Sequence, residues 1–153
     1  MTLRSTLLLS AFALLAAATA GPGCTTACTA VGCGDHIRFV FDRSVPRDYT
    51  VTVTVAGQVG TADCTAAANP DTTATHLVQL SGGLTEYVEC GADSFSYLGA
   101  PGRIAIVLEY ADGSRTEAEA QPAYTEVYPN GEDCDPVCEQ ASADITVHAP
   151  SGS

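Results

Sequence analysis

The feature that most constrains the fold of this chain is a strict alternation of apolar and polar residues, which is clearest in residues 49–55. There Tyr49, Val51, Val53 and Val55 alternate with threonines. Because successive side chains of a β-strand point to opposite faces, this run predicts a strand with one face in a core and the other in water. No segment after the first 23 residues shows a helical period, so we expect an all-β protein.

Shorter runs of this kind recur along the chain, separated by residues typical of turns. The expected strands are residues 36–41, 49–55, 59–64, 76–80, 84–90, 103–110, 115–120, 124–128 and 143–147. In one of them we expect Leu84, Val88 and Cys90 to share the buried face. Asp112-Gly113 favours a two-residue hairpin turn, since both central positions of a type I′ turn need positive φ. About seven to nine short strands predict an immunoglobulin-like β-sandwich, stapled by disulfides.

The N-terminal residues have the features of an export signal. Arg4 provides a positive charge, residues 7–18 form a short apolar run, and residues 18–20 are a small-residue cleavage site. The apolar run is shorter than the ~20 residues of a membrane-spanning helix. Ordinary processing would cut after Ala20, whereas lipoprotein-type processing would cut directly before Cys24 and leave it as the lipidated N-terminus.

These features divide the chain into four parts. We expect a lipoprotein-type signal peptide at 1–23 (with cleavage after residue 20 as the alternative), a cysteine-containing segment at 24–34, a β-sandwich domain at 35–149 and a flexible tail at 150–153. The roughly 130 residues after the signal suffice for one domain. We therefore expect an exported protein of the cell envelope, lipid-anchored or free in the periplasmic or extracellular space.

The chain has seven cysteines, and an odd number in an exported protein requires one of them to be explained separately. Lipidation of Cys24 would leave six, enough for three disulfides in an oxidising compartment. Cys64 and Cys90 end two expected strands on inward faces. Joining them would close a loop of about 26 residues and stabilise the fold by roughly 3 kcal/mol.

The other four cysteines lie near the two ends of the domain, Cys28 and Cys33 before the first strand and Cys134 and Cys138 before the last. Bridges between these two pairs would tie the first strand to the last loop and close a very long loop. Bridges within each pair are an alternative that the sequence leaves open, because six cysteines allow 15 arrangements. A structural zinc site at the same four cysteines is another, since their spacings are compatible with zinc.

The chain is strongly acidic, with 18 Asp and Glu against 6 Lys and Arg and a formal net charge of −12. This charge argues against nucleic-acid binding, which needs a basic footprint, and against electrostatic adhesion to anionic lipid. We therefore expect membrane contact only through a lipid anchor, an unidentified protein or glycan as partner, and no cofactor. Tyr97, Tyr124 and Tyr128 are the aromatic candidates to stack on a sugar.

One acidic loop offers candidate metal ligands. Asn130, Glu132, Asp133 and Asp135 place several oxygens close together in the sequence, and calcium binds through six to eight oxygens. The spacing is not that of an EF-hand, and a short acidic loop in so acidic a chain is more often simply solvated. The loop therefore supports an alternative interpretation, a calcium-stabilised adhesion or glycan-binding domain.

Catalytic motifs are absent from the sequence. There is no G-x-S-x-G, no H-E-x-x-H and no phosphate-binding loop. His36, His76 and His148 have no nucleophile in a recognisable context nearby. We expect no enzyme activity. An exported hydrolase is the second alternative, and it would need a pocket that joins a histidine to a carboxylate and a nucleophile.

The closing segment carries a family resemblance. Its matching positions are Pro129, Asn130, Gly131, Cys134, Pro136, Cys138, Gln140 and Ala141, in the pattern PNGxxCxPxCxQA. Together with the lipoprotein-like signal, the TAVGC run at 29–33 and the YTVTVTVAG hairpin, this pattern resembles small uncharacterised lipoproteins of myxobacteria-type bacteria. The resemblance implies an exported β domain and brings no activity with it. Our interpretation is a non-catalytic structural or binding module of the cell envelope.

Overall fold

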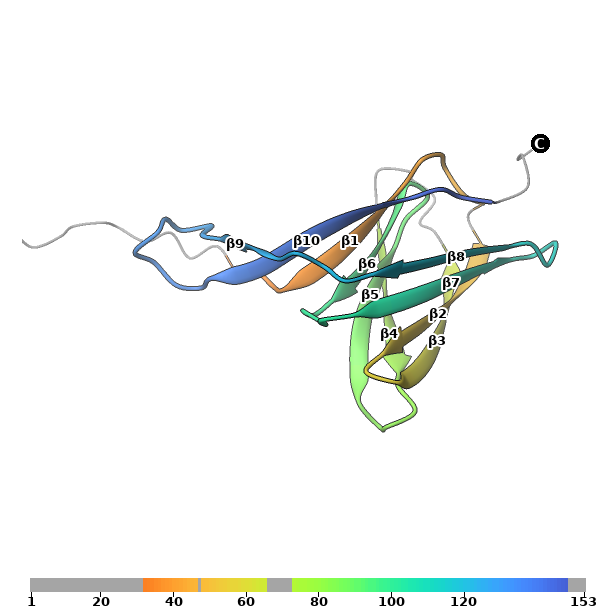
Figure 1. The fold of residues 1–153 in the computed structure, drawn as a ribbon, viewed down its shortest axis with the longest axis horizontal. Helices are drawn as coiled ribbons and strands as arrows, with labels where there is room; N and C mark the ends of the chain where they lie inside the picture. The colour runs from red at the N-terminus through yellow and green to blue at the C-terminus, as the bar shows by residue number, and fades with distance from the viewer. Residues whose placement is uncertain (1–31, 47, 66–72, 149–153) are drawn as a thin grey trace, which may run out of the picture.

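The computed structural model describes residues 32–46, 48–65 and 73–148, which form two β-sheets (Figure 1). The strands are β1 His36–Phe41, β2 Asp48–Val55, β3 Gln58–Thr65, β4 Ala74–Gln79, β5 Thr85–Cys90, β6 Ser94–Leu98, β7 Ile104–Tyr110, β8 Arg115–Ala120, β9 Thr125–Val127 and β10 Cys138–Ile145. The order is β4-β5-β6-β1-β10-β9 in the six-stranded sheet and β3-β2-β7-β8 in the four-stranded sheet. The expected all-β class is confirmed, and the arrangement is sandwich-like.

Several expectations fall on residues that the structure does not describe. These are the signal peptide at 1–23, the lipidation site Cys24, Cys28, and the tail at 150–153. Within the described ranges, no helix has the length and apolarity needed to span a membrane.

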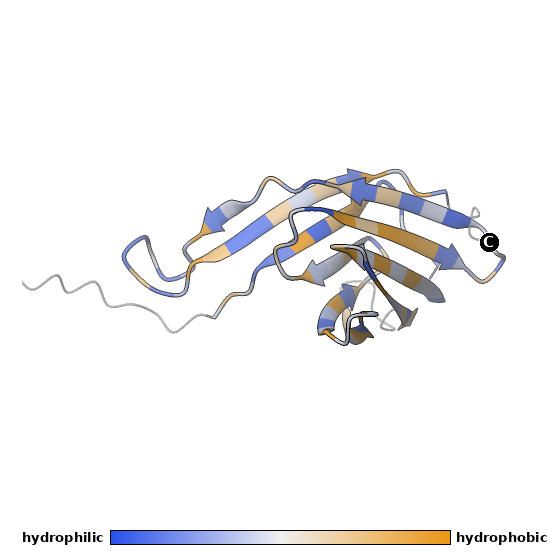
Figure 2. Ribbon diagram, turned by 60° about the horizontal axis from the view of Figure 1, so that its bottom comes forward, coloured by the Kyte–Doolittle hydropathy of each residue, from blue (hydrophilic) through white to orange (hydrophobic). Residues whose placement is uncertain are grey.

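The core of the four-stranded sheet follows the alternation of the sequence. Tyr49, Val51 and Val53 of β2 are buried and lie opposite buried residues of β7 in an antiparallel register. The threonines between them lie on the other face, beside the outward residues of β3. Figure 2 shows the resulting alternation of hydrophobic and hydrophilic residues along the strands. The assignment of the strand faces from the sequence is therefore confirmed here.

The six-stranded sheet supplies the facing half of the core. Phe39 of β1 and Phe95 of β6 are fully buried, with ring centroids 6.2 Å apart. β6 was not expected from the sequence, so ten strands replace the seven to nine predicted. Phe95 and Tyr97 alternate with Ser94 and Ser96 as a half-buried strand requires, but this signal spans only four residues and was overlooked.

One predicted face was wrong. Leu84 does not share the buried face of Val88 and Cys90 but is 56 % exposed. Gly83 adopts a positive φ of 86°, and the turn it forms continues through Leu84, so that β5 begins only at Thr85. The expected strand, residues 84–90, therefore began one residue too early. At Asp112-Gly113 a hairpin joins β7 to β8, but it is not the expected two-residue type I′ turn, because residues 111–114 separate the strands and only Gly113 (φ 82°), not Asp112, has a positive φ. The two-residue turn with positive φ at both positions is instead Ala56-Gly57, between β2 and β3.

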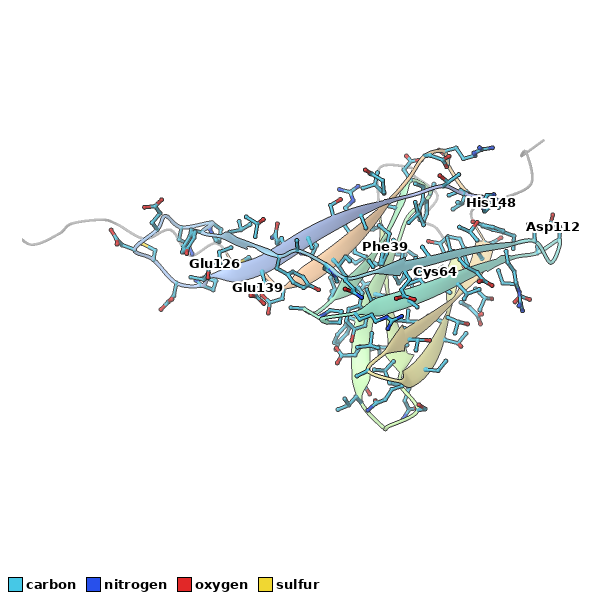
Figure 3. The ribbon with its side chains drawn as sticks, in the orientation of Figure 1. Phe39, Cys64, Asp112, Glu126, Glu139 and His148 are labelled. Atoms are coloured by element: carbon cyan, nitrogen blue, oxygen red, sulfur yellow. A yellow bond between two sulfur atoms is a disulfide. The ribbon has the colours of Figure 1, made fainter. Side chains whose placement is uncertain are left out.

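The first and last strands lie side by side in parallel, with His36 opposite Gln140 and Phe41 opposite Ile145. A carboxylate holds each end of this pair. Asp35 accepts a hydrogen bond from the backbone N–H of Glu139 (2.8 Å), and Asp42 accepts one from that of Val147 (2.9 Å). β9, the start of β10 and the loop between them extend beyond the sandwich as an arm, residues 125–139 (Figure 1). Figure 3 places Glu126 and Glu139 on this arm.

Two disulfides fix this arrangement. Cys64 of β3 is bonded to Cys90 of β5, the pairing expected from the sequence, and both residues are buried with their Cα atoms 5.6 Å apart. Because β3 and β5 belong to different sheets, this bridge joins the two layers. Cys33 is bonded to Cys138 across 105 residues, with a Cα–Cα distance of 6.1 Å, and ties the entry of β1 to the start of β10.

The bridges decide between the alternatives for the terminal cysteines. Cys134 is disulfide-bonded as well, to a cysteine outside the described residues. Neither Cys33 nor Cys138 is bonded within its own pair, so pairing between the two ends replaces local pairing. The zinc alternative also fails for these described cysteines, because a sulfur in a disulfide is not a thiolate ligand.

Removing the bridge between the sheets should destabilise the domain. The double substitution Cys64→Ala/Cys90→Ala is expected to lower the free energy of unfolding by about 3 kcal/mol, because it releases a loop of 26 residues in the unfolded chain. Urea denaturation at neutral pH measures the change. Thr65→Ser/Thr85→Ser, exposed positions on the same two strands, is the matched control and should change stability by less than about 0.5 kcal/mol. Equal stability of the two double variants would contradict the expectation.

The inward tyrosines should make the domain sensitive to alkaline pH. Burial raises the pKa of Tyr97 to about 12, helped by the charge of Glu86, and burial together with the charge of Glu139 raises the pKa of Tyr124 to about 12. Unfolded tyrosines titrate near pH ~10, so the free energy of unfolding should be level below that pH and fall as the pH rises towards 12. Urea denaturation across this range tests it. In Tyr97→Phe/Tyr124→Phe the free energy of unfolding should fall less steeply between pH ~10 and 12. The same steepness as in the unsubstituted protein would show that these two tyrosines do not cause the fall.

Candidate functional site

A hollow of about 490 Å³ lies on the outer face of the six-stranded sheet. It is lined by His36, Arg38, Val40, Ala123, Thr125, Gln140, Ala141 and Ser142. The parallel register of β1 and β10 places His36 beside Gln140 and Arg38 beside Ser142. The hollow forms next to β9 because this strand is only three residues long and pairs with β10 at Cys138, Glu139 and Gln140.

Arg38 supplies the positive charge of this hollow. Its neighbours in register are Ser96 on β6 and Ser142 on β10, whose side chains are small. The other arginines of the described ranges each have a carboxylate within 4 Å, in the pairs Arg43–Asp42, Arg103–Glu119 and Arg115–Glu109. Within those ranges, Arg38 is the one arginine without an ion pair. Its guanidinium is therefore available to an external acceptor.

A row of apolar side chains leads away from the hollow across the same face. Leu77 of β4 lies opposite Tyr87 of β5, which lies opposite Leu98 of β6. Leu77 is 59 % exposed and Tyr87 52 % exposed. Continuing the β1–β6 register by one residue beyond Ile37–Tyr97 brings Leu98 beside His36 at the edge of the hollow. We call this row, together with the hollow, the binding face.

The aromatic residues singled out from the sequence are not those of the binding face. Tyr97 is only 3 % exposed and belongs to the core, so it is not available for stacking on a sugar. Tyr124 is half-buried and its hydroxyl donates to the carbonyl of Pro101 (3.1 Å), while the hydroxyl of Tyr128 donates to Glu126. Tyr87 was not among the expected sugar-stacking residues. A signal was available, because Tyr87 directly precedes the inward-facing Val88 and neighbouring residues of a strand point to opposite faces.

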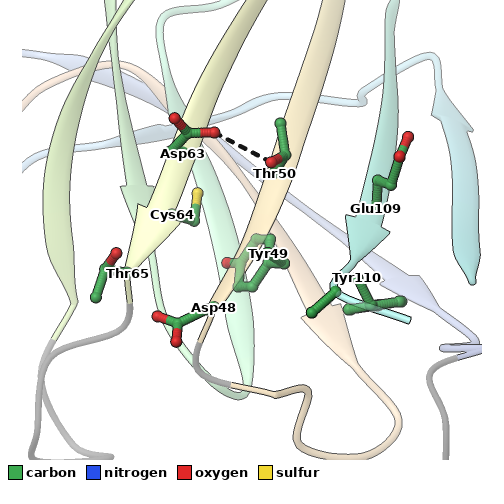
Figure 4. A pocket seen from close by; sticks show the side chains of 9 residues that line it. Asp48, Tyr49, Thr50, Asp63, Cys64, Thr65, Glu109 and Tyr110 are labelled. Carbon is green, nitrogen blue, oxygen red and sulfur yellow. Dashed lines mark hydrogen bonds between the residues drawn. The ribbon is translucent and has the colours of Figure 1, made fainter. Parts of the chain in front are cut away.

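A second hollow, of about 430 Å³, lies over one end of the four-stranded sheet (Figure 4). Its outward groups include Asp48, Asp63 and Glu109. Two of these carboxylates already have partners, because Asp63 accepts a hydrogen bond from the hydroxyl of Thr50 (3.1 Å) and Glu109 accepts two from Arg115 (3.1 and 2.7 Å). This hollow is therefore acidic, but two of its three carboxylates are already hydrogen-bonded within the protein. It offers a ligand fewer unpaired polar groups than the binding face.

The candidate calcium ligands lie in the loop of the arm. Glu132, Asp133 and Asp135 are exposed, and the side-chain amide of Asn130 donates to the backbone carbonyl of Asp135 (2.8 Å). In the part of the chain that the structure describes, no group of three or more His, Cys, Asp or Glu side chains is placed to hold a metal ion.

The three histidines occupy separate places. His36 begins β1, with its Nδ1 3.2 Å from the carbonyl of Gly34, and His76 lies on β4 opposite Val88 with a buried Nε2 atom. His148 follows β10, and its backbone N–H donates to the hydroxyl of Thr116. Among the described residues, none of these rings is hydrogen-bonded to a serine hydroxyl or a carboxylate. The arrangement that the hydrolase alternative requires is therefore not formed by these side chains.

Comparison with known proteins adds no assignment. No protein-family model, no curated protein and no solved structure matches this chain.

Calcium should not stabilise the domain. With no described cluster of ligands, thermal unfolding in excess calcium and in excess chelator should give Tm values that agree within about 1 °C, since a ligand raises stability only by binding the folded state. Glu132→Gln/Asp133→Asn, which removes two candidate ligands, should respond in the same way. A calcium-dependent rise of several degrees that this variant loses would instead show a calcium site in the arm.

Proposed function

We propose that this protein is an exported, lipid-anchored binding module of the cell envelope and that it acts without catalysis. The observation that carries the proposal is the binding face, where an exposed tyrosine, an exposed leucine and an arginine without an ion pair lie on one sheet. Exposed apolar side chains that continue into a polar hollow are typical of sites for extended ligands. The ligand of this module is a glycan or a protein.

The disulfides support the export part of the proposal. Stable disulfides form in oxidising compartments outside the cytosol, and the described part of this small domain has them between its sheets and between its ends. They agree with the export signal expected at residues 1–23 and with the resemblance to small lipoproteins of myxobacteria-type bacteria.

Cysteine parity supports the lipid anchor. Of the seven cysteines, five are disulfide-bonded in the described part of the chain, and Cys134 takes its partner from outside it. We propose Cys28 as that partner, because it comes five residues before Cys33, much as Cys134 comes four residues before Cys138. This pairing leaves Cys24 as the one cysteine without a bridge, free to carry a lipid.

The finer description of the fold is also a proposal. An immunoglobulin-like relationship is supported by the two packed sheets and by a buried disulfide that joins them, as in antibody domains. The strand order β4-β5-β6-β1-β10-β9 over β3-β2-β7-β8 differs from the ABED over CFG order of those domains, so the proposed likeness is one of architecture and not of topology.

Lipidation can be tested directly. Mass spectrometry of the mature protein from host membranes should show Cys24 as the lipid-modified N-terminus and no free thiol. Cys24→Ala should move the protein from the membrane to the soluble fraction, because the proposed anchor is the acyl chains on this cysteine. Thr25→Ala is the matched control and should stay in the membrane fraction. A mature N-terminus at Gly21 together with one free thiol would overturn the anchor.

A further inference from the structure

We propose that the binding face takes a carboxylate-bearing sugar chain, with the carboxylate on Arg38 and a sugar ring on Tyr87. This inference rests on the proposed binding function and names the ligand class for the same face. It follows from three features of the face: a free cation, a set of neutral hydrogen-bonding groups, and a narrow apolar row.

The first feature is the guanidinium of Arg38. In a chain of net charge −12, every other arginine in the described ranges has a carboxylate within 4 Å. Arg38 instead lies between Ser96 and Ser142 in register, of which Ser142 is exposed and Ser96 is buried. A planar guanidinium binds a carboxylate through two parallel hydrogen bonds, so the missing partner of Arg38 is best supplied by a carboxylate of the ligand.

The acidic residues around Arg38 restrict how many charges the ligand can carry. On the same face, Glu89 of β5 lies opposite Ser96, and Asp144 of β10 lies opposite Val40. Neither comes within 4 Å of Arg38, yet both would repel further carboxylates near the one that binds. The face therefore favours a chain in which acidic units are separated by neutral ones over a densely charged polyanion.

The second feature is the neutral lining of the hollow. Gln140 contributes an amide, and Ser142 and Thr125 contribute hydroxyls. None of these three side chains is hydrogen-bonded to another described residue. Amides and hydroxyls both donate and accept, as sugar hydroxyls do, so the groups next to Arg38 match a saccharide better than an apolar or purely ionic ligand.

The third feature is the row that leads from Leu77 through Tyr87 and Leu98 to His36 and Gln140. From Tyr87 to Gln140 this row crosses three strand spacings, about 14 Å. A tyrosine ring offers an apolar face with a polar hydroxyl at its edge, which suits the C–H face of a sugar.

The width of the row favours a linear chain over a globular partner. The next row of the same face is polar, with Glu89, Ser96, Arg38 and Ser142 in register. A stable protein interface buries about 800 Å² on each partner around an apolar centre, and a single row of three apolar side chains offers much less.

Calorimetry with four probes tests the inference. The mature protein, purified in mild detergent, is titrated with a tetrasaccharide of alternating glucuronate and N-acetylglucosamine, with the neutral N-acetylglucosamine tetramer, with a galacturonate tetramer and with the peptide Gly-Glu-Gly-Glu. The alternating tetrasaccharide should bind about tenfold or more tightly than the neutral tetramer, because only it can pair with Arg38. It should also bind more tightly than the other two acidic probes, and more weakly at high salt.

Substitutions then assign the contacts. Arg38→Gln should abolish the preference for the alternating tetrasaccharide over the neutral one, whereas Arg115→Gln, an exposed arginine on the other sheet, should leave it unchanged. Tyr87→Ala should weaken both sugars by a similar factor. Arg38 and Tyr87 are exposed, and urea denaturation verifies that each variant is folded.

The possible outcomes separate this inference from the proposed function. Equal binding of the acidic and neutral tetrasaccharides, insensitive to Arg38→Gln, would overturn the carboxylate site while leaving a glycan-binding module in place. Preference for Gly-Glu-Gly-Glu would overturn the sugar class and favour a protein partner. Binding of no probe would overturn the inference, and the glycan form of the proposed function would fall with it.

Discussion

The parallel pairing of β1 with β10 is the constraint on which the site depends. The two strands are separated by nearly the whole domain in sequence, and the bridge Cys33–Cys138 holds their entry together while Asp35 and Asp42 accept backbone hydrogen bonds at the two ends. A slip of one residue in a strand moves every side chain to the opposite face. By fixing the register, these contacts keep Arg38 outside and Phe39 inside the core.

Features of the fold that depend on neighbouring residues could be predicted from the sequence, whereas features that depend on distant residues could not. The alternation in β2 and β7 gives the buried face of each strand, because that face needs only the period of the strand itself. Strand partners over long distances are not encoded in this way, so the parallel pair and the sheet order could not be derived. β6 is a different case, because its alternation of Phe95 and Tyr97 with serines is local but only four residues long.

The site shows the same division. Cysteine positions near both ends suggested a covalent tie between them, which the Cys33–Cys138 bridge confirms. Asn130, Glu132, Asp133 and Asp135 resembled a site because they are close in sequence, yet adjacent carboxylates on an exposed turn need not converge. The absence of an ion pair at Arg38 within the described ranges depends on which side chains lie across β6 and β10, and no pattern along the chain reports that.

The anchor and the binding face have compatible geometry. With the proposed lipid on Cys24, the nine residues to Cys33 span at most about 30 Å, so the arm stays close to the membrane. Cys138 on the arm is bonded to Cys33, and β10 runs from there into the sandwich, so the sheet is carried away from the surface along the direction of the arm (Figure 1). The row from Tyr87 to Gln140 crosses the strands instead of following them, so a chain lying along the envelope could follow this row and pass beside Arg38 without approaching the lipid.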